Sequence, residues 1–338
     1  MNQPDHLPLL AVKHLGVAFR TDQGQVLAVD DVSFELAPGQ VLGIAGESGC
    51  GKSVTALSLM RLLPKPVSKI IAGEILFKGQ NLLDLPINAM RKIRGKKISM
   101  IFQEPMTALN PVHTIGRQVA EIYSLHFPGM DARQRDRASL QMIEKVGIPD
   151  APQVMKKYPH QLSGGMRQRV MISMALACEP DILIADEPTT ALDVTVQAQI
   201  MDLIFQFRDK TGMAVILITH DLGLIAENCD RVVVMYAGTV AEIASVKHLF
   251  RQPFHPYTQG LLKSIPSLAQ TAKQHLPTIP GNVPALTEMP TGCRFAKRCK
   301  KVMIKCENHR PGLMQICCNH YAACHLAHGG EKKLNFNK

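Results

Sequence analysis

The 338-residue sequence lacks a long apolar run and any internal repeat. No stretch of about 18 consecutive apolar residues occurs, so we expect no membrane-spanning helix. Residues 1–8 contain neither a basic start nor an apolar run, so we also expect no signal peptide. The hydrophobic content of 46% is nevertheless normal for a protein with a proper core. We therefore expect a cytosolic protein, or one that partners hold on a membrane.

Residues 46–53 read Gly-Glu-Ser-Gly-Cys-Gly-Lys-Ser, which is the G-x-x-x-x-G-K-S pattern of a phosphate-binding loop. The apolar segment 41–45 before it predicts a buried strand, and 53–63 after it predicts a helix that stops at Pro64. Glycines let backbone amides curl around an anion, and the helix N-terminus adds partial positive charge. Lys52 can reach the β- and γ-phosphates, and the Ser53 hydroxyl can ligate Mg²⁺. The sequence therefore predicts binding of a nucleoside triphosphate.

Polar residues follow two later apolar runs. Asp186 and Glu187 follow the run at 182–185, and His220 follows the one at 213–219. In P-loop ATPases an aspartate at a strand end holds Mg²⁺, and a second carboxylate can activate water. Two adjacent carboxylates in such a place are unfavourable without a cation or a hydrogen-bonding partner. We expect His220 at the γ-phosphate, because ligands bind at the carboxyl ends of parallel strands; the alternative is a structural histidine.

The alternation of strands and helices predicts a parallel α/β core. Residues 9–45 predict short strands with turns, 112–158 predict a helical insert, and 232–243 predict a final hairpin. Ser163 is placed to cap a helix over 166–178, whose bare amides make either a second phosphate site or a capped structural element.

The last 49 residues hold ten Lys/Arg and two Asp/Glu, so most of the net charge of +10 lies there. A basic tail can indicate nucleic acid, anionic lipid or a negatively charged bound group. Six of the nine cysteines fall between Cys293 and Cys324. Without an export signal, such a cluster favours a metal site over disulfides. Four thiolates can bind Zn²⁺ or a [4Fe–4S] cluster, although zinc ligands are usually closer in sequence; free thiols are the remaining alternative.

These motifs stand in the order found in ATP-binding-cassette (ABC) ATPases of membrane transporters, which residues 9–325 resemble. The matches are the Walker A loop at 46–53, the Q-loop at Gln103, the signature motif at 162–166 with Met166 in place of the commoner Gln, Walker B at 182–187, the D-loop at 191–193 and the switch histidine at His220. Four further segments resemble the dipeptide, oligopeptide and nickel importer branch of this family, closest to a dipeptide ATP-binding subunit. These segments are 102–111, 186–199, 255–258 and 290–295.

The resemblance implies an α/β P-loop ABC nucleotide-binding domain over 1–263, with a helical insert at about 104–165. A linker and a small cysteine-rich extension would follow over 264–338. It implies catalytic roles for Glu187, His220 and Gln103, and Mg²⁺ ligation through Ser53, Gln103 and Asp186. The implied ATP-binding residues are Phe19, Gly46, Glu47, Ser48, Gly49, Cys50, Gly51, Lys52 and Ser53. The implied signature-motif and D-loop residues are Ser163, Gly164, Gly165 and Asp193. Of these, Ser163 and Gly165 would complete the opposite subunit's site.

In that branch the tail carries a [4Fe–4S] cluster, which assigns Cys293, Cys299, Cys306 and Cys324 as ligands, the last preferred over Cys317 and Cys318. Zn²⁺ is the alternative. The implied partners are a second ABC ATPase, most simply a related paralogue, two transmembrane permease subunits and a periplasmic or extracellular peptide-binding protein, with no nucleic acid. The chain would lie peripherally on the cytoplasmic face of the inner membrane.

Rival interpretations remain. Nickel, glutathione or antimicrobial peptides are alternative cargoes. The basic tail suggests a soluble ABC protein acting on nucleic acid, but such proteins commonly carry two cassettes and this sequence has one P-loop. A P-loop kinase is disfavoured by the signature motif and by His220.

Overall fold

The computed structural model of the protein describes residues 7–22, 24–104, 108–189, 193–265, 278–317 and 319–328. The chain divides into two compact units. Unit 1 comprises residues 1–9, 36–40 and 81–218, and unit 2 comprises residues 10–35, 41–80 and 219–338. The described helices include none with the length and apolarity that crossing a membrane requires.

Unit 1 contains three buried parallel strands: β6 (Ile98–Ile101), β7 (Ile182–Asp186) and β8 (Ala214–Thr219). All three are apolar almost throughout, as expected for strands of a parallel sheet that is covered on both faces. The apolar runs at 182–185 and 213–219 therefore form buried strands, as the predicted parallel core requires. Asp186 is the last residue of β7, so the acidic pair stands where the apolar run ends.

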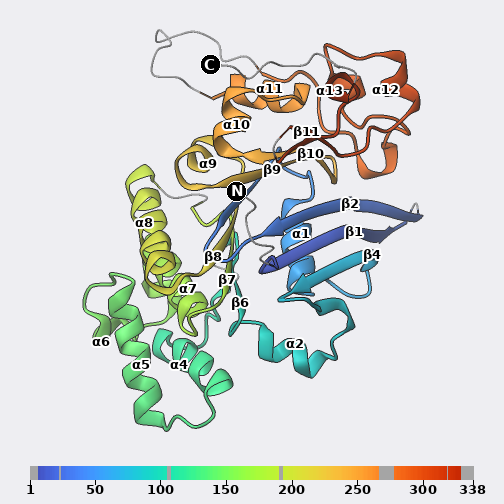
Figure 1. Cartoon of the computed structure of the whole chain (residues 1–338). Helices are drawn as coiled ribbons and strands as arrows, with labels where there is room; N and C mark the ends of the chain where they lie inside the picture. Colours follow the sequence, from blue (N-terminus) through green and yellow to red (C-terminus); the bar gives the residue numbers. More distant parts are fainter. Residues whose placement is uncertain are drawn as a thin grey trace. The chain divides into compact units, whose positions relative to one another are not determined.

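The helices of unit 1 include the predicted insert. Residues 112–158 form α4, α5 and α6, and α4 and α5 contact each other and α7 (Figure 1). A capping box between Asp131 and Gln134 begins α5. The bounds in this unit are η1 Leu82–Asp84, α2 Ile87–Ile93, α4 Ile115–His126, α5 Ala132–Lys145, α6 Ala151–Val154, η2 Pro159–Gln161, α7 Gly164–Leu176 and α8 Val194–Thr211.

Unit 2 contains an antiparallel sheet in the order β2–β1–β4–β5. Its strands are β1 (Leu10–Thr21), β2 (Gly24–Leu36), β4 (Ser68–Phe77) and β5 (Gln80–Asn81). The short strands expected over 9–45 are instead two strands of 12 and 13 residues and the short β3. A register shift between Lys13 and Gly16 lets β1 continue past its polar residues. In the sequence, these polar residues break the alternation of apolar and polar positions and so suggest that the strand ends there.

The other strands of unit 2 run in the order β11 (Met314–Cys317), β12 (His320–Ala322), β10, β9 and β3. Strand β3 (Val41–Ala45) pairs in parallel with β9 (Arg231–Tyr236), and β9 forms the predicted hairpin with β10 (Thr239–Ser245). Helix α1 (Lys52–Leu59) ends before the predicted position, because Arg61 adopts φ 51°, which an α-helix cannot accommodate.

The C-terminal segment adds strands to the hairpin of unit 2. Strand β12 pairs antiparallel with β10, and β11 pairs with β12. The remaining bounds are α9 Leu222–Asn228, α10 Val246–Arg251, α11 Pro256–Lys263, η3 Leu286–Glu288, η4 Ala296–Arg298, α12 Ile304–Asn308, β11 Met314–Cys317, β12 His320–Ala322 and α13 His325–His328. Residues 266–277, at the start of the predicted linker, lie outside the described residues.

Candidate nucleotide site

The loop at 46–53 connects β3 to α1, so the strand–loop–helix context predicted for it is present. Gly46 has φ 151° and Gly51 has φ 100°, values that residues with side chains rarely adopt. A Cβ atom at Gly46 would lie 2.3 Å from the carbonyl oxygen of Met235, so no larger residue fits there. Glycine at this position is therefore required by both backbone conformation and space.

Lys52 is 6% exposed and begins α1. Its ammonium donates to the carbonyl oxygens of Gly46, at 2.8 Å, and Glu47, at 3.2 Å. An ammonium group has three donors, so these contacts leave capacity for a phosphate oxygen. Cys50 is fully buried, and desolvation raises the pKa of its thiol, so only its main chain can face a ligand.

Two other predicted site residues of unit 2 have defined surroundings. Phe19 lies near the end of β1 and lines a cavity of about 480 Å³ together with residues from 66–69. His220 is exposed and directly follows β8. The next residue, Asp221, caps α9 by accepting from the amide of Gly223 at 2.7 Å. The role of Phe19 in ATP binding and that of His220 at the γ-phosphate stay predictions.

In unit 1 the structure brings Gln103 and Glu187 together. The Gln103 Nε2 atom donates to Glu187 Oε2 at 3.1 Å. Glu187 has φ 47°, and its amide donates to the carbonyl oxygen of Ile218 at 2.9 Å. Positive φ in a residue other than glycine is uncommon and is enriched at functional sites. Asp186 beside it is 4% exposed.

The signature residues begin α7. The Ser163 hydroxyl accepts from the amide of Met166 at 3.3 Å, which confirms the predicted cap. A Cβ atom at Gly165 would lie 3.2 Å from Val196 of α8, whereas Gly164 has open space. Asp193 caps α8, and its D-loop neighbours 191 and 192 lie outside the described residues. Ser163, Gly164 and Asp193 are therefore at helix starts of one unit.

The prediction of an iron–sulfur cluster is wrong for this structure, as is its zinc alternative. Four cysteines line one cavity of only about 10 Å³, which is room for no more than a water: Cys293, Cys299, Cys306 and Cys324. Across the described ranges, no group of three or more His, Cys, Asp or Glu side chains could hold a metal ion. Desolvation raises the pKa of the Cys293 thiol to about 11. Cys318 is outside the described residues.

The predicted Mg²⁺ ligands are divided between the two units. Ser53 belongs to unit 2, and Gln103 and Asp186 belong to unit 1. Their assembly as a ligand set stays a prediction.

Sequence reasoning missed the residues that contact Glu47 from the C-terminal segment. The Glu47 amide donates to the hydroxyl of Tyr257, and its carboxylate pairs with Arg298. Tyr257 lies in the segment 255–258 and Arg298 lies just after the segment 290–295, and both segments resemble the importer branch in sequence. Neither stretch carries a signal that connects it to a loop some 200 residues earlier.

Comparison with known proteins decides the family. A profile described as ABC transporter matches residues 29–190, and one described as oligopeptide/dipeptide transporter, C-terminal region, matches 241–306. A probable peptide ABC transporter ATP-binding protein from Sinorhizobium fredii is 52% identical, with 94% of both chains covered. The chain belongs to the ABC transporter family. A dipeptide transport ATP-binding protein from Bacillus subtilis is also 52% identical to this ABC ATPase, with 94% of each chain covered.

Solved cassettes support the same fold. A dimeric ATP-binding cassette in a post-hydrolysis state, bound to ADP and Pi, matches with a TM-score of 0.64 at 27% identity. The match covers 70% of this ABC ATPase and 98% of the solved chain. The mixed α/β ABC ATPase fold expected from the sequence is therefore confirmed, and ABC ATPases of this family hydrolyse ATP.

Proposed function

We propose that the chain is the ATP-hydrolysing subunit of a membrane ABC importer for dipeptides or oligopeptides. The observation that carries the peptide assignment is the C-terminal profile match at 241–306. This match lies outside the cassette profile at 29–190, so it supports the transporter class independently. The 52% identity to a dipeptide transport ATP-binding protein over 94% of both chains supports the same cargo class.

The hydrolytic roles follow the positions of the side chains. Lys52 and the loop amides bind the phosphates of ATP, and Ser53, Gln103 and Asp186 hold its Mg²⁺. Glu187 polarises the attacking water, because it directly follows the Mg²⁺ carboxylate and its own carboxylate accepts from Gln103. His220 contacts the γ-phosphate. The support for this assignment is the position of each group: Lys52 and Ser53 begin α1, and the other side chains lie at or just after the ends of β6, β7 and β8.

The ABC ATPase acts in a pair, in which Ser163, Gly164, Gly165 and Asp193 complete the site of the opposite subunit. The exposed start of α7 supports this role, because helix N-termini favour anions. The likeness to a dimeric solved cassette also supports it. The opposite subunit is a second ABC ATPase, most simply a related paralogue.

The further partners are two permease subunits and a peptide-binding protein outside the membrane, which place the chain peripherally at the cytoplasmic face. We assign 1–263 to the nucleotide-binding domain, with the insert at about 104–165, and 264–338 to the C-terminal extension. The docking surface for the permeases is the part of the insert at 104–123, of which 105–107 lie outside the described residues.

The test is ATP hydrolysis in the assembled transporter. The ATPase is copurified with its permeases, reconstituted into vesicles with the binding protein, and assayed with dipeptides, longer peptides, nickel and glutathione. We expect peptides to stimulate phosphate release. Stimulation by nickel or glutathione alone would replace the peptide assignment, and copurification with no membrane protein would reject the importer.

A further inference from the structure

A carboxylate stands inside the anion-binding loop and is paired with the C-terminal segment. Glu47 is the second residue of the loop, and both its oxygens are held by Arg298. The Arg298 Nη1 atom lies 2.5 Å from Oε2, and Nη2 lies 3.0 Å from Oε1. This two-point geometry is the strongest form of the arginine–carboxylate pair. The Arg298 side chain is 6% exposed, so the pair is shielded on the arginine side.

The main chain of Glu47 is held from the same direction. Its amide donates to the hydroxyl of Tyr257 at 2.9 Å. Tyr257 is fully buried, and its ring packs against the rings of Tyr236, at 4.7 Å between centroids, and Phe295, at 5.4 Å. The hydroxyl therefore has a fixed position, and the loop amide is fixed with it.

Arg298 is itself fixed by several contacts. It donates to the carbonyl oxygens of Pro280, at 3.0 Å, and Ile279, at 3.2 Å, and to the Tyr236 hydroxyl at 3.4 Å. The hydrogen bonds to Glu47 raise the pKa of the guanidinium further above its already high value, so it is charged at every physiological pH. The segment at 279–298 therefore presents a permanent positive charge to the loop.

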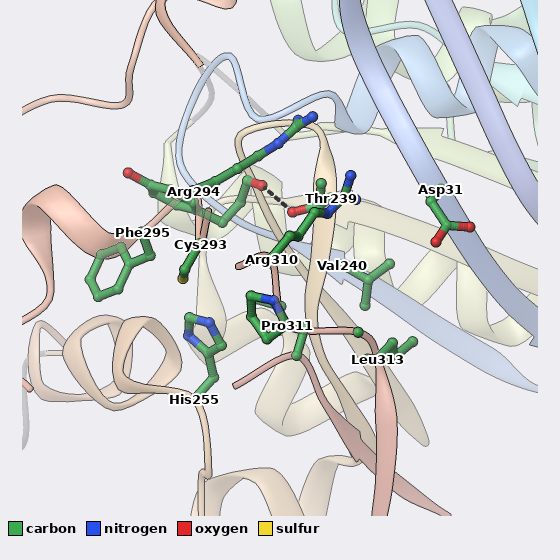
Figure 2. Close-up of a pocket in the computed structure, with 14 residues that line it drawn as sticks. Asp31, Thr239, Val240, His255, Cys293, Arg294, Phe295, Arg310, Pro311 and Leu313 are labelled. Carbon is green, nitrogen blue, oxygen red and sulfur yellow. Dashed lines mark hydrogen bonds between the residues drawn. The ribbon is translucent and has the colours of Figure 1, made fainter. Parts of the chain in front are cut away.

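A second connection reaches the loop through the β9–β10 turn. Arg294 donates to the carbonyl oxygen of Ala237 and pairs with Asp30. The next turn residue, Gly238, donates to the carbonyl oxygen of Cys50 in the loop at 2.9 Å. Figure 2 shows Arg294 beside Cys293 and Phe295, on the wall of a cavity of about 220 Å³. The C-terminal segment thus contacts the loop directly at Glu47 and indirectly at Cys50.

The charge of Glu47 explains why the direct contact matters. Like charges a few ångströms apart repel, and the repulsion is stronger where water is partly excluded. The Lys52 ammonium donates to the carbonyl oxygen of Glu47 at 3.2 Å. Glu47 therefore lies beside the group that would bind the phosphates. A carboxylate left without a partner there would oppose the binding of a triphosphate.

We infer that Arg298 is a positioning residue for ATP binding: it neutralises the carboxylate of Glu47 and holds it away from the phosphates. The C-terminal segment, which lies outside the cassette profile, thereby sets the nucleotide affinity of the ABC ATPase. The inference rests on the proposed function, because it assumes that the loop binds ATP.

The test measures the Kd of the full-length chain for Mg²⁺·ATP by titration with a fluorescent ATP analogue, at low and high salt. We expect Arg298→Gln to weaken binding about tenfold at low salt. The effect should be smaller at high salt, because the Glu47 carboxylate is 27% exposed and salt partly screens its charge. Adding Glu47→Gln to Arg298→Gln should restore most of the lost affinity, since no uncompensated carboxylate then remains. Arg298→Lys keeps the charge but cannot make the two-point pair, so its Kd should lie between those of the parent and Arg298→Gln.

Lys297→Ala is the matched control. It removes one positive charge from the exposed neighbouring position and should leave Kd unchanged. A thermal melt of each variant reports whether it folds. If Arg298→Gln does not fold, the inference is tested by comparing the Kd of Arg298→Lys with that of Lys297→Ala. A tenfold loss of ATP affinity in Arg298→Lys overturns the inference. Failure of Glu47→Gln to restore affinity also overturns it, because loss of packing alone would not be rescued. A parent chain that binds no ATP would instead reject the proposed function.

Discussion

Gln103 donates a hydrogen bond to Glu187 at 3.1 Å, although the two residues are 84 positions apart in the sequence. They meet because β6 and β7 are adjacent and parallel, so the residues after both strands lie at one edge. Glu187 also adopts φ 47° and is tied by its amide to Ile218. The carboxylate therefore has a fixed direction, as a group that must orient a water molecule requires.

Glu187→Gln should bind ATP with near-parental affinity and hydrolyse it on the order of 10²-fold more slowly, because loss of a general base typically has that effect. Phosphate release in the assembled transporter and a nucleotide titration measure the two quantities. Glu179→Gln is the matched control, since Glu179 is an exposed residue of the same unit that also has positive φ. Near-parental turnover in Glu187→Gln would contradict the assignment.

The elements that carry the predicted motifs could be foreseen because each motif is local. The loop at 46–53 needs only a strand before it and a helix after it. The apolar runs at 41–45 and 182–185 form strands that are buried on both faces, as strands of a parallel sheet usually are. Ser163 as a helix cap follows from the residue type and the helix that comes after it.

The pairing of Glu47 with Arg298 could not be foreseen, because it depends on tertiary structure across 251 residues. The cysteine-rich tail and its family resemblance predicted four ligands of an iron–sulfur cluster, but the sequence does not show how much space lies between them. The cavity between the four cysteines is about 10 Å³, which does not accommodate a cluster. The length of β1 was missed because a register shift is not visible in the apolar pattern.

Lys52→Ala should weaken ATP binding itself, in contrast to Glu187→Gln. The ammonium is held in the loop by two carbonyl oxygens, and its loss removes the positive charge that faces the phosphates. We expect at least a tenfold rise in the Kd for Mg²⁺·ATP, since charge-assisted hydrogen bonds contribute about 1.5–3 kcal/mol. Lys13→Ala, at an exposed position of β1, is the control. Unchanged affinity in Lys52→Ala would remove the basis for the phosphate-binding role of the loop.

The isolated ABC ATPase should hydrolyse ATP poorly, because each site needs the signature residues of an opposite subunit. Phosphate release per chain should rise with protein concentration, and with added partner ATPase. Size-exclusion chromatography with light scattering at each concentration gives the oligomeric state. Ser163→Arg should abolish the concentration-dependent part, because a cation would replace the cap and fill the space at Gly164. Full turnover in a strictly monomeric sample would exclude the paired mechanism.

Acid should destabilise unit 2 through His255. This side chain is 4% exposed, and burial lowers its pKa to about 4, against the opposing effect of Glu242. Its Nδ1 atom accepts from the amide of Tyr257 at 3.0 Å, and only an unprotonated nitrogen can do so. Since the unfolded chain binds this proton near pH 6.5, the stabilisation is complete above that pH and is lost as pH falls toward 4.

The loss amounts to about 3 kcal/mol for this group by pH 4, at about 1.4 kcal/mol per pKa unit. Urea unfolding at several values between pH 7.5 and pH 4.5 measures it, with tyrosine fluorescence as the signal. His255→Asn keeps a hydrogen-bond acceptor but cannot titrate, so its stability should fall less steeply with acid than that of the parent. His248→Asn, on α10 of the same unit, controls for the loss of any histidine. Parallel curves for the parent and His255→Asn would show that His255 does not carry the acid sensitivity.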